Sequence, residues 1–164
     1  MQRIKLDAID RRILAELQAD GRITNVELSK RAGISAPPCL RRVRALEEQG
    51  LIRGYHADID PKPLGYEVEF FAMVGLGSQA EADLKAFIEQ VQAWPHIREA
   101  HMLSGEVDFI LKGLARDLAG FHAIVGELTA TKNVAHVKTS FVIRATKREP
   151  GVPMDAPDLK RKPG

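Results

Sequence analysis

At 164 residues, with a formal net charge of +2 and 28% charged side chains, the chain has the composition of an ordinary globular protein of one or two small domains, and we expect two. Cys39 is the only cysteine, which excludes an internal disulfide and a zinc site built from several cysteines. No apolar stretch approaches the roughly 20 residues of a membrane-spanning helix, and the first residues lack the apolar run of a signal peptide, so we expect a cytoplasmic protein.

Two helices with clear start signals are predicted over the first 32 residues. The first begins after Asp7, a good N-cap, and ends near residue 20, with apolar residues at helical spacing: Ile9, Ile13, Leu14 and Leu17. The second begins after Thr24 and runs to Ala32. Glu27 follows Thr24 at the spacing of a capping box, in which each side chain accepts a bond from the other residue's backbone N–H.

A third helix follows a sharp turn at Gly33, whose missing Cβ permits a tight corner. Ser35 is its predicted N-cap, and it reaches about Gln49. Helical spacing predicts that three apolar residues face the other helices: Leu40, Val43 and Leu46. The same spacing leaves Arg42 at the edge and turns four residues outward: Pro37, Arg41, Arg44 and Glu48. Such a helix can present its N-terminal half to base edges in a DNA major groove.

The basic residues are concentrated in this helical part. Residues 1–55 contain 11 Lys or Arg and 7 Asp or Glu, a net charge of +4, whereas residues 56–164 contain 13 and 15, a net charge of −2. A localised basic surface attracts the phosphate backbone of a nucleic acid. Surface arginines that only serve solubility are the alternative, and charge alone does not decide between the two.

The pattern changes after residue 55. The cluster DPKP at residues 60–63 marks a linker, which we place at residues 56–65, between a helix-turn-helix domain at 1–55 and a second domain at 66–148. Periodicity in the second domain predicts the order βαββαβ: a strand at 66–75, a helix at 81–93, strands at 97–103 and 107–114, a helix capped by Asp117, and a strand at 134–147.

This order predicts an α+β fold in which two helices cover one face of a four-stranded antiparallel sheet, the ferredoxin-like arrangement. Soluble monomers rarely expose an apolar sheet face, so we expect a second copy of the chain to pair through the other face or its edges. The tail at residues 149–164 is rich in proline and charged residues, and we expect it to be disordered.

Long motifs in both parts of the chain follow a known pattern. In the helical part they are LDAIDRRIL at residues 6–14, DGRITNVELS at 20–29, GISAPPCL at 33–40, RVRALE at 42–47 and GLIRGY at 50–55. In the second domain the motif is SGEVD at residues 104–108. The first group resembles the winged-type helix-turn-helix of Lrp/AsnC transcription regulators, and the last is similar to the ligand loop of the family's amino-acid-sensing domain. The resemblance covers about residues 4–148.

The resemblance implies a regulator that binds double-stranded DNA, forms a homodimer that often assembles into an octamer, and responds to an effector, usually an amino acid, bound between dimers. It implies recognition-helix roles for Ser35, Pro37, Pro38, Cys39, Arg41, Arg42 and Arg44. It implies effector-response roles for Met102, Ser104, Gly105, Val107 and Asp108, and for Phe141, Val142 and Ile143 on the last strand. We expect neither a cofactor nor a metal ion.

Simpler roles remain open for several of these residues. Arg42 either contacts DNA or holds Glu47 or another acid in a surface ion pair. Cys39 is expected to be a semi-exposed packing residue and no nucleophile, because neither a second cysteine nor an activating base accompanies it. Gly105 is a hairpin glycine whose missing side chain would also let backbone N–H groups approach a carboxylate. Asp108 either caps its strand, pairs with a lysine, or binds an α-ammonium group.

We expect no enzymatic activity. His101, Ser104 and Asp108 are close in sequence, but side-chain directions alternate along strands, and nothing supplies the oxyanion donors of an acyl-transfer site. The histidines are dispersed, and no glycine-rich phosphate loop is present. Two other classes remain. One is a ligand-sensing or oligomerising module without its own DNA target. The other is an RNA binder that uses the sheet, but the chain lacks the stacking aromatics expected on a central strand.

Overall fold

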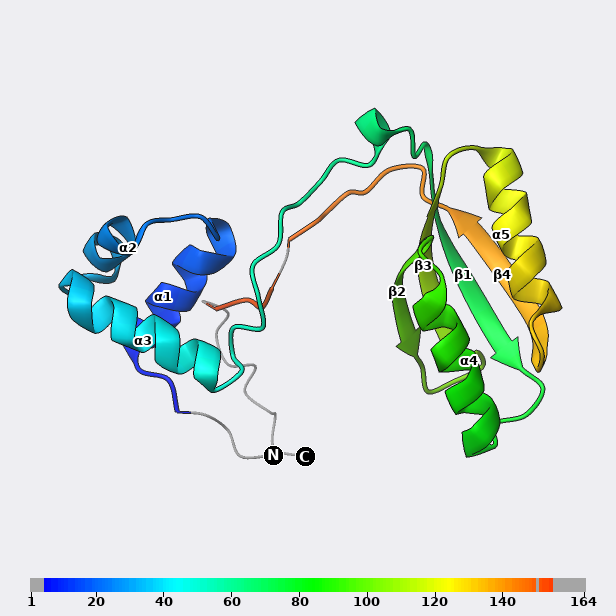
Figure 1. The fold of residues 1–164 in the computed structure, drawn as a ribbon, viewed down its shortest axis with the longest axis horizontal. Helices are drawn as coiled ribbons and strands as arrows, with labels where there is room; N and C mark the ends of the chain where they lie inside the picture. The colour runs from blue at the N-terminus through cyan, green and yellow to red at the C-terminus, as the bar shows by residue number, and fades with distance from the viewer. Residues whose placement is uncertain (1–4, 150, 155–164) are drawn as a thin grey trace, which may run out of the picture. The chain divides into compact units, whose positions relative to one another are not determined.

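The computed structural model describes residues 5–149 and 151–154. Within them the chain forms two compact units, one that runs up to Asp58 and resumes at Lys147, and one that spans Ile59–Thr146 (Figure 1). The described part of the first unit contains three helices. The second contains a four-stranded sheet, two helices and the short 3-10 helix η1 (Lys62–Leu64). Each unit has its own buried core.

The first unit is built from α1 (Ala8–Ala19), α2 (Asn25–Ala32) and α3 (Ala36–Glu48), which confirms the three predicted helices. Gly33, between α2 and α3, has a φ of +74°, a left-handed conformation that glycine adopts without strain. The described residues before Val68 contain no β-strand. The segment after α3 is extended, at the position where a winged domain has its wing.

The core of the first unit differs from the prediction at one turn of α3. Its buried apolar residues are Ile13, Leu28, Ala32, Cys39 and Leu46. Leu40, predicted to face the other helices, is 39% exposed, whereas Cys39 is fully buried. Successive residues turn by about 100° around a helix, so Cys39, Val43 and Leu46 share the inward face and Leu40 lies outside it. The predicted core position of Leu40 and the semi-exposed position of Cys39 are therefore both wrong.

The capping box predicted for α2 is only half formed. Thr24 accepts a bond from the Glu27 N–H at 3.2 Å, but the Glu27 carboxylate accepts a bond from Arg31 at 3.1 Å. An ion pair with Arg31 thus takes the place of the reciprocal bond. The complete reciprocal arrangement is found at the start of α1, between Asp7 and Asp10.

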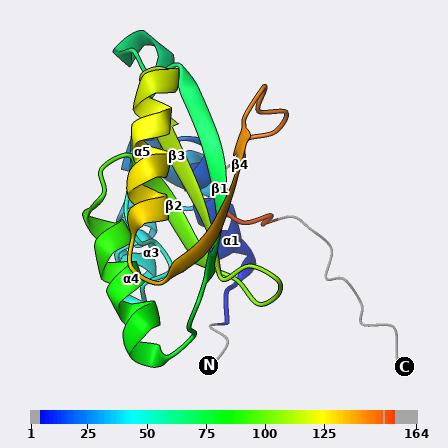
Figure 2. The same ribbon diagram turned by 90° about the vertical axis from the view of Figure 1, so that its right-hand side faces the viewer.

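The second unit confirms the predicted order βαββαβ. Its elements are β1 (Val68–Leu76), α4 (Glu81–Ala93), β2 (Ile97–Met102), β3 (Phe109–Ala115), α5 (Leu118–Ala130) and β4 (Val134–Phe141). The strands form one antiparallel sheet in the order β2-β3-β1-β4, and α4 and α5 lie along the same face of it (Figure 2). β4 ends at Phe141, before the predicted residue 147, where it pairs with Phe70 near the start of β1.

Alternate residues of β1 form the centre of the second core. Phe70, Ala72 and Val74 are fully buried beneath the two helices. The Phe70 ring packs edge-on against Phe121 of α5, with 5.1 Å between ring centroids. It also lies over Gly113, its register partner on β3, where an added Cβ would overlap the ring. Glycine is therefore required at position 113 for a packing reason.

Part of the predicted disordered tail lies against α1. The Gln18 side chain donates to the Val152 carbonyl at 3.0 Å and accepts from the Val152 N–H at 2.7 Å. The expected disorder does not hold for Val152. Residue 150 and residues 155–164 of the predicted tail lie outside the described residues.

We predict that Gly113→Ala lowers the free energy of unfolding of the second unit by about 1–3 kcal/mol, because the added methyl overlaps the Phe70 ring in a closely packed core. Gly126→Ala is the matched control. Gly126 lies within α5, and a Cβ there meets nothing within 4 Å, so this variant should gain up to about 1 kcal/mol. Urea unfolding followed by circular dichroism measures both, and equal stabilities would contradict the packing described for Gly113.

Candidate DNA-binding face and effector loop

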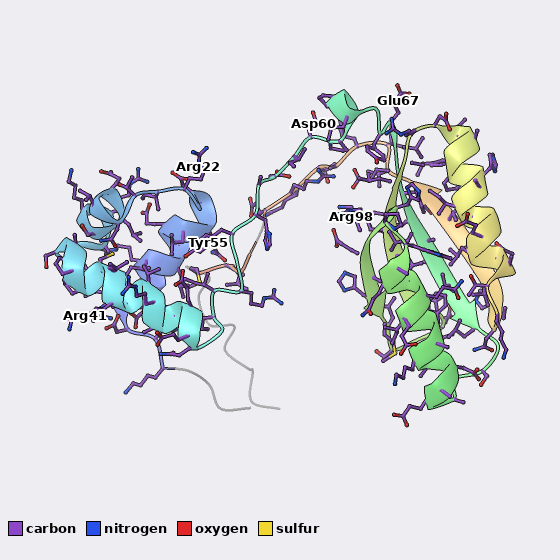
Figure 3. The ribbon with its side chains drawn as sticks, viewed as in Figure 1. Arg22, Arg41, Tyr55, Asp60, Glu67 and Arg98 are labelled. Carbon is purple, nitrogen blue, oxygen red and sulfur yellow. The ribbon has the colours of Figure 1, made fainter. Side chains whose placement is uncertain are left out.

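The outward face of α3 carries two arginines that are free of acidic partners. Arg41, labelled in Figure 3, and Arg44 are both exposed. No acidic side chain in the described part of the chain lies within ion-pair distance of either. Pro37 is exposed on the same face, one turn before Arg41. Guanidinium groups without internal partners are available to phosphates and to guanine O6 and N7.

Arg42 points instead to the start of α1. Its Nη1 donates to Asp7 Oδ2 and to Asp10 Oδ1, both at 2.7 Å. The remaining oxygen of each aspartate accepts the backbone N–H of the other, so the capping box and the ion pairs together occupy all four carboxylate oxygens. The bond from the Asp10 N–H, followed by the Arg42 guanidinium, lowers the pKa of Asp7. Of the two roles open for Arg42, the structure shows the ion pair, with these aspartates in place of Glu47.

Glu47 has a different partner. Its carboxylate accepts a bond from the Tyr55 hydroxyl at 3.0 Å, which ties the extended segment after α3 to the end of that helix. Burial, and then the neighbouring Glu47, raise the pKa of Tyr55 to about 12. The hydroxyl therefore stays protonated and remains a donor at neutral pH. Figure 3 labels Tyr55 on this segment.

Two residues in the first turn of α3, Pro37 and Pro38, lack backbone donors. Ser35 is the N-cap, but its side chain makes no capping bond, because the residues that would donate to it are Pro37 and Pro38, which have no N–H. Ser35 is exposed, so its hydroxyl is available to a phosphate, and Pro38 is half-buried. Cys39 is fully buried, and burial raises the pKa of its thiol. A side chain without exposed surface cannot contact DNA, so Cys39 is a core residue.

The predicted effector loop joins β2 to β3. Met102, the last residue of β2, is 62% exposed and lines a cavity of about 370 Å3 between α4 and β2. Ser104 and Gly105 are exposed, whereas Val107 is half-buried. Gly105 has a φ of +146°, and a Cβ there would meet nothing within 4 Å. The tip of the loop is therefore open to solvent.

Asp108 supports the base of this loop. Its Oδ2 accepts the Leu76 N–H at 2.6 Å, and its Oδ1 accepts from the Gln79 side chain at 2.7 Å. One oxygen thus binds the end of β1 and the other the loop that follows it, and of the roles left open for Asp108 the structure shows a capping one. Sequence reasoning missed Gln79, which lies 29 residues away, a separation at which local spacing carries no signal.

A second contact, centred on Asn133, holds the same β1–α4 loop from the α5–β4 side. Asn133 adopts a φ of +71°, uncommon for a residue with a Cβ. Its side chain donates to the Ser78 carbonyl at 2.8 Å, and its own carbonyl accepts the Gly77 N–H at 2.8 Å. Sequence reasoning missed this residue as well, although asparagine is one of the residues that tolerate this conformation.

The sheet register keeps the two groups of predicted effector residues apart, one at the β2–β3 loop and one at the end of β4. Met102 is aligned across the sheet with Phe109 and Val74, whereas Phe141 is paired with Phe70, four residues away along β1. β2 and β4 are also the opposite edges of the sheet. Four residues along a strand span roughly 13 Å and three strand spacings roughly 14 Å, so the two groups are roughly 20 Å apart. A single chain does not bring them together.

Phe141 and Ile143, at the opposite corner of the sheet from Met102, are exposed. Phe141 is half exposed and contacts the Phe121 ring, with 4.6 Å between centroids. The Val142 N–H donates to the Glu69 carbonyl at 2.8 Å, which extends the pairing one residue past β4. Ile143 is 99% exposed and lies beyond the strand on which it was predicted.

Within the described residues, no group of three or more His, Cys, Asp or Glu side chains is arranged to hold a metal ion. No helix among them has the length and apolar character needed to cross a membrane.

Comparison with known proteins identifies both units. Residues 6–53 match the family model for winged helix-turn-helix DNA-binding domains, and residues 69–152 match the model for the Lrp/AsnC ligand binding domain. The leucine-responsive regulatory protein of Rhizobium meliloti (strain 1021) is 58% identical over 146 residues, which cover 88% of this chain and 94% of that protein. The Escherichia coli (strain K12) protein of the same name is 42% identical over 144 residues, covering 87% and 88%.

Solved structures show the same likeness. A transcriptional regulator of Neisseria meningitidis in complex with L-Met has a TM-score of 0.87 and 34% identity, over 92% of this chain and 98% of that one. An AsnC family transcriptional regulator of Agrobacterium tumefaciens has a TM-score of 0.86 and 32% identity, over the same shares. These relatives are transcriptional regulators and not enzymes. The chain therefore belongs to the Lrp/AsnC family of DNA-binding transcriptional regulators, with an N-terminal helix-turn-helix and a C-terminal ligand-binding domain.

Proposed function

We propose that the chain recognises double-stranded DNA through the outward face of α3, with Arg41 and Arg44 as its cations and the Ser35 hydroxyl as a phosphate donor. One observation carries this assignment: these arginines are exposed and without acidic partners in the described structure, whereas Arg31 and Arg42 are paired with acids of their own unit. Ion pairs within the unit therefore occupy Arg31 and Arg42, and Arg41 and Arg44 are the arginines of α3 that remain for DNA.

The sheet supplies the proposed means of assembly. α4 and α5 cover one of its faces, and the alternate residues on the other face include apolar side chains such as Phe71, Met73 and Ile110. Pairing of two copies through this face produces a homodimer in the cytoplasm that presents two copies of α3. The half-sites of its operator are then separated by about one helical turn of DNA or a multiple of it. Further association to an octamer adds avidity without new DNA contacts.

The proposed effector is an amino acid with an apolar side chain, bound between copies of the chain. The register supports a shared site, because Met102 and Phe141 lie at opposite corners of one sheet. The exposed apolar character of Met102, Phe141 and Ile143 supports the choice of side chain, as do the L-Met held by the Neisseria meningitidis relative and the leucine-responsive names of the others. Effector binding favours one assembly over another and thereby changes DNA binding.

Arg44→Ala is expected to weaken DNA binding and to reduce the slope of log affinity against log salt by about 0.9 for each phosphate that Arg44 neutralises. Arg42→Ala is the control on the same helix. It should lower the melting temperature of the first unit, because it leaves Asp7 and Asp10 without their cation, and it should leave the salt slope unchanged. Fluorescence anisotropy over a salt series measures the salt slope of both variants. A smaller slope for Arg42→Ala would place Arg42 on the DNA.

For the effector, we predict that leucine, methionine or another apolar amino acid raises the melting temperature in a thermal-shift screen of the twenty amino acids, because a ligand that binds only the folded protein stabilises it. Gly105→Asp should abolish this response by repelling the effector's carboxylate. Gly105→Ala carries the same backbone strain at a φ of +146° without the charge and should keep a response. If Gly105→Asp responds to the amino acid as the wild-type chain does, the effector site lies elsewhere.

For assembly, sedimentation of the wild-type chain at micromolar concentration is expected to show a dimer or a larger oligomer. Met73→Glu, which places a charge on the open sheet face, should shift the distribution to smaller species. Leu118→Glu is the control, since Leu118 is an exposed apolar residue at the start of α5. A stable wild-type monomer would contradict the proposal.

A further inference from the structure

Leu40 is an apolar side chain on the DNA-binding side of α3. It is 39% exposed, whereas Cys39, Val43 and Leu46 supply the inward face. At about 100° per residue, Leu40 lies about 40° from Arg44 and about 60° from Pro37 around the helix axis. It is about 100° from Cys39, on the opposite side from Arg44. Leu40 therefore adjoins the proposed contact face.

Two residues in the turn before Leu40 offer no backbone donor. Pro37 and Pro38 lack backbone N–H groups, so these two positions of the first turn offer nothing that could bond to a base or a phosphate. The start of α2 lies against this turn, because the Asn25 side chain donates to the Ala36 carbonyl at 2.9 Å, and the residue next to it, Val26, is also exposed and apolar. Leu40, the prolines and Val26 thus place apolar surface beside the Ser35 hydroxyl and the arginines of α3.

The C5-methyl of thymine is the one apolar group on a base edge in the major groove, and apolar side chains recognise it by contact. We propose that Leu40 contacts a thymine methyl in each half-site and so determines specificity at that position. The inference rests on the proposed use of α3 as the recognition helix. It assigns to Arg41 and Arg44 the electrostatic part of binding and to Leu40 a part of the sequence preference.

The test removes the methyl from the DNA and the side chain from the protein. A preferred duplex is first selected from a randomised pool with the wild-type chain, and each thymine of one half-site is then replaced singly by deoxyuridine, which lacks only the C5-methyl. We expect wild-type affinity to fall about fourfold at one position, the effect of removing one buried methyl group. Leu40→Ala should bind the thymine and deoxyuridine duplexes at that position equally well.

Leu51→Ala is the matched control, because Leu51 is 37% exposed but lies after α3, and it should keep the wild-type sensitivity to deoxyuridine. Leu40→Asn preserves the length and branching of the side chain and should lose the sensitivity as Leu40→Ala does, which guards against a folding defect in one variant. Wild-type indifference to every replacement, or undiminished sensitivity in both Leu40 variants, would overturn the assignment of Leu40 alone. Failure to select any duplex would overturn the proposed DNA recognition by α3 together with it.

Discussion

The ion pairs of Arg42 with Asp7 and Asp10 join α3 to the start of α1 and, with the core beneath them, hold α3 in place. The two aspartates cap the start of α1 by accepting each other's backbone N–H groups, and each has one oxygen left for the guanidinium. A single side chain of α3 is therefore joined to the N-terminus of α1 at two points. These ion pairs and the burial of Cys39 and Leu46 act on the same helix and leave its other side to solvent.

The ligand-binding domain combines a fixed frame with an open loop tip. Asp108 and Asn133 hold the β1–α4 loop from two sides through hydrogen bonds to Leu76, Gln79, Gly77 and Ser78. The tip of the loop, at residues 104–106, is exposed, and a Cβ added at Gly105 would meet nothing within 4 Å. A base held by hydrogen bonds limits the entropy lost when a ligand orders the tip, as the proposed shared effector site requires.

Helix and strand positions could be predicted closely because they follow from local chemistry. Asp7, Thr24 and Asp117 each cap the helix expected of them, and Gly33 takes the left-handed conformation required by its turn. The candidate site was predictable only in part. The exposure of Arg41 and Arg44 follows from helical spacing, whereas the partners of Arg42 lie more than 30 residues away. Leu40 was wrongly predicted to be in the core because it lies three residues before Val43, a spacing as compatible with a helix as the four residues between Cys39 and Val43.

The sequence by itself determined the two-domain plan, the order of the elements, the family resemblance and the extent of α3, since periodicity, capping and motif spacing are properties of neighbouring residues. Only the tertiary structure decided which arginines are consumed by ion pairs, that Asp108 braces β1, and that Met102 and Phe141 lie at opposite corners of the sheet. The physical reason is that these outcomes depend on strand order and on helix packing, which bring together residues that no local pattern relates.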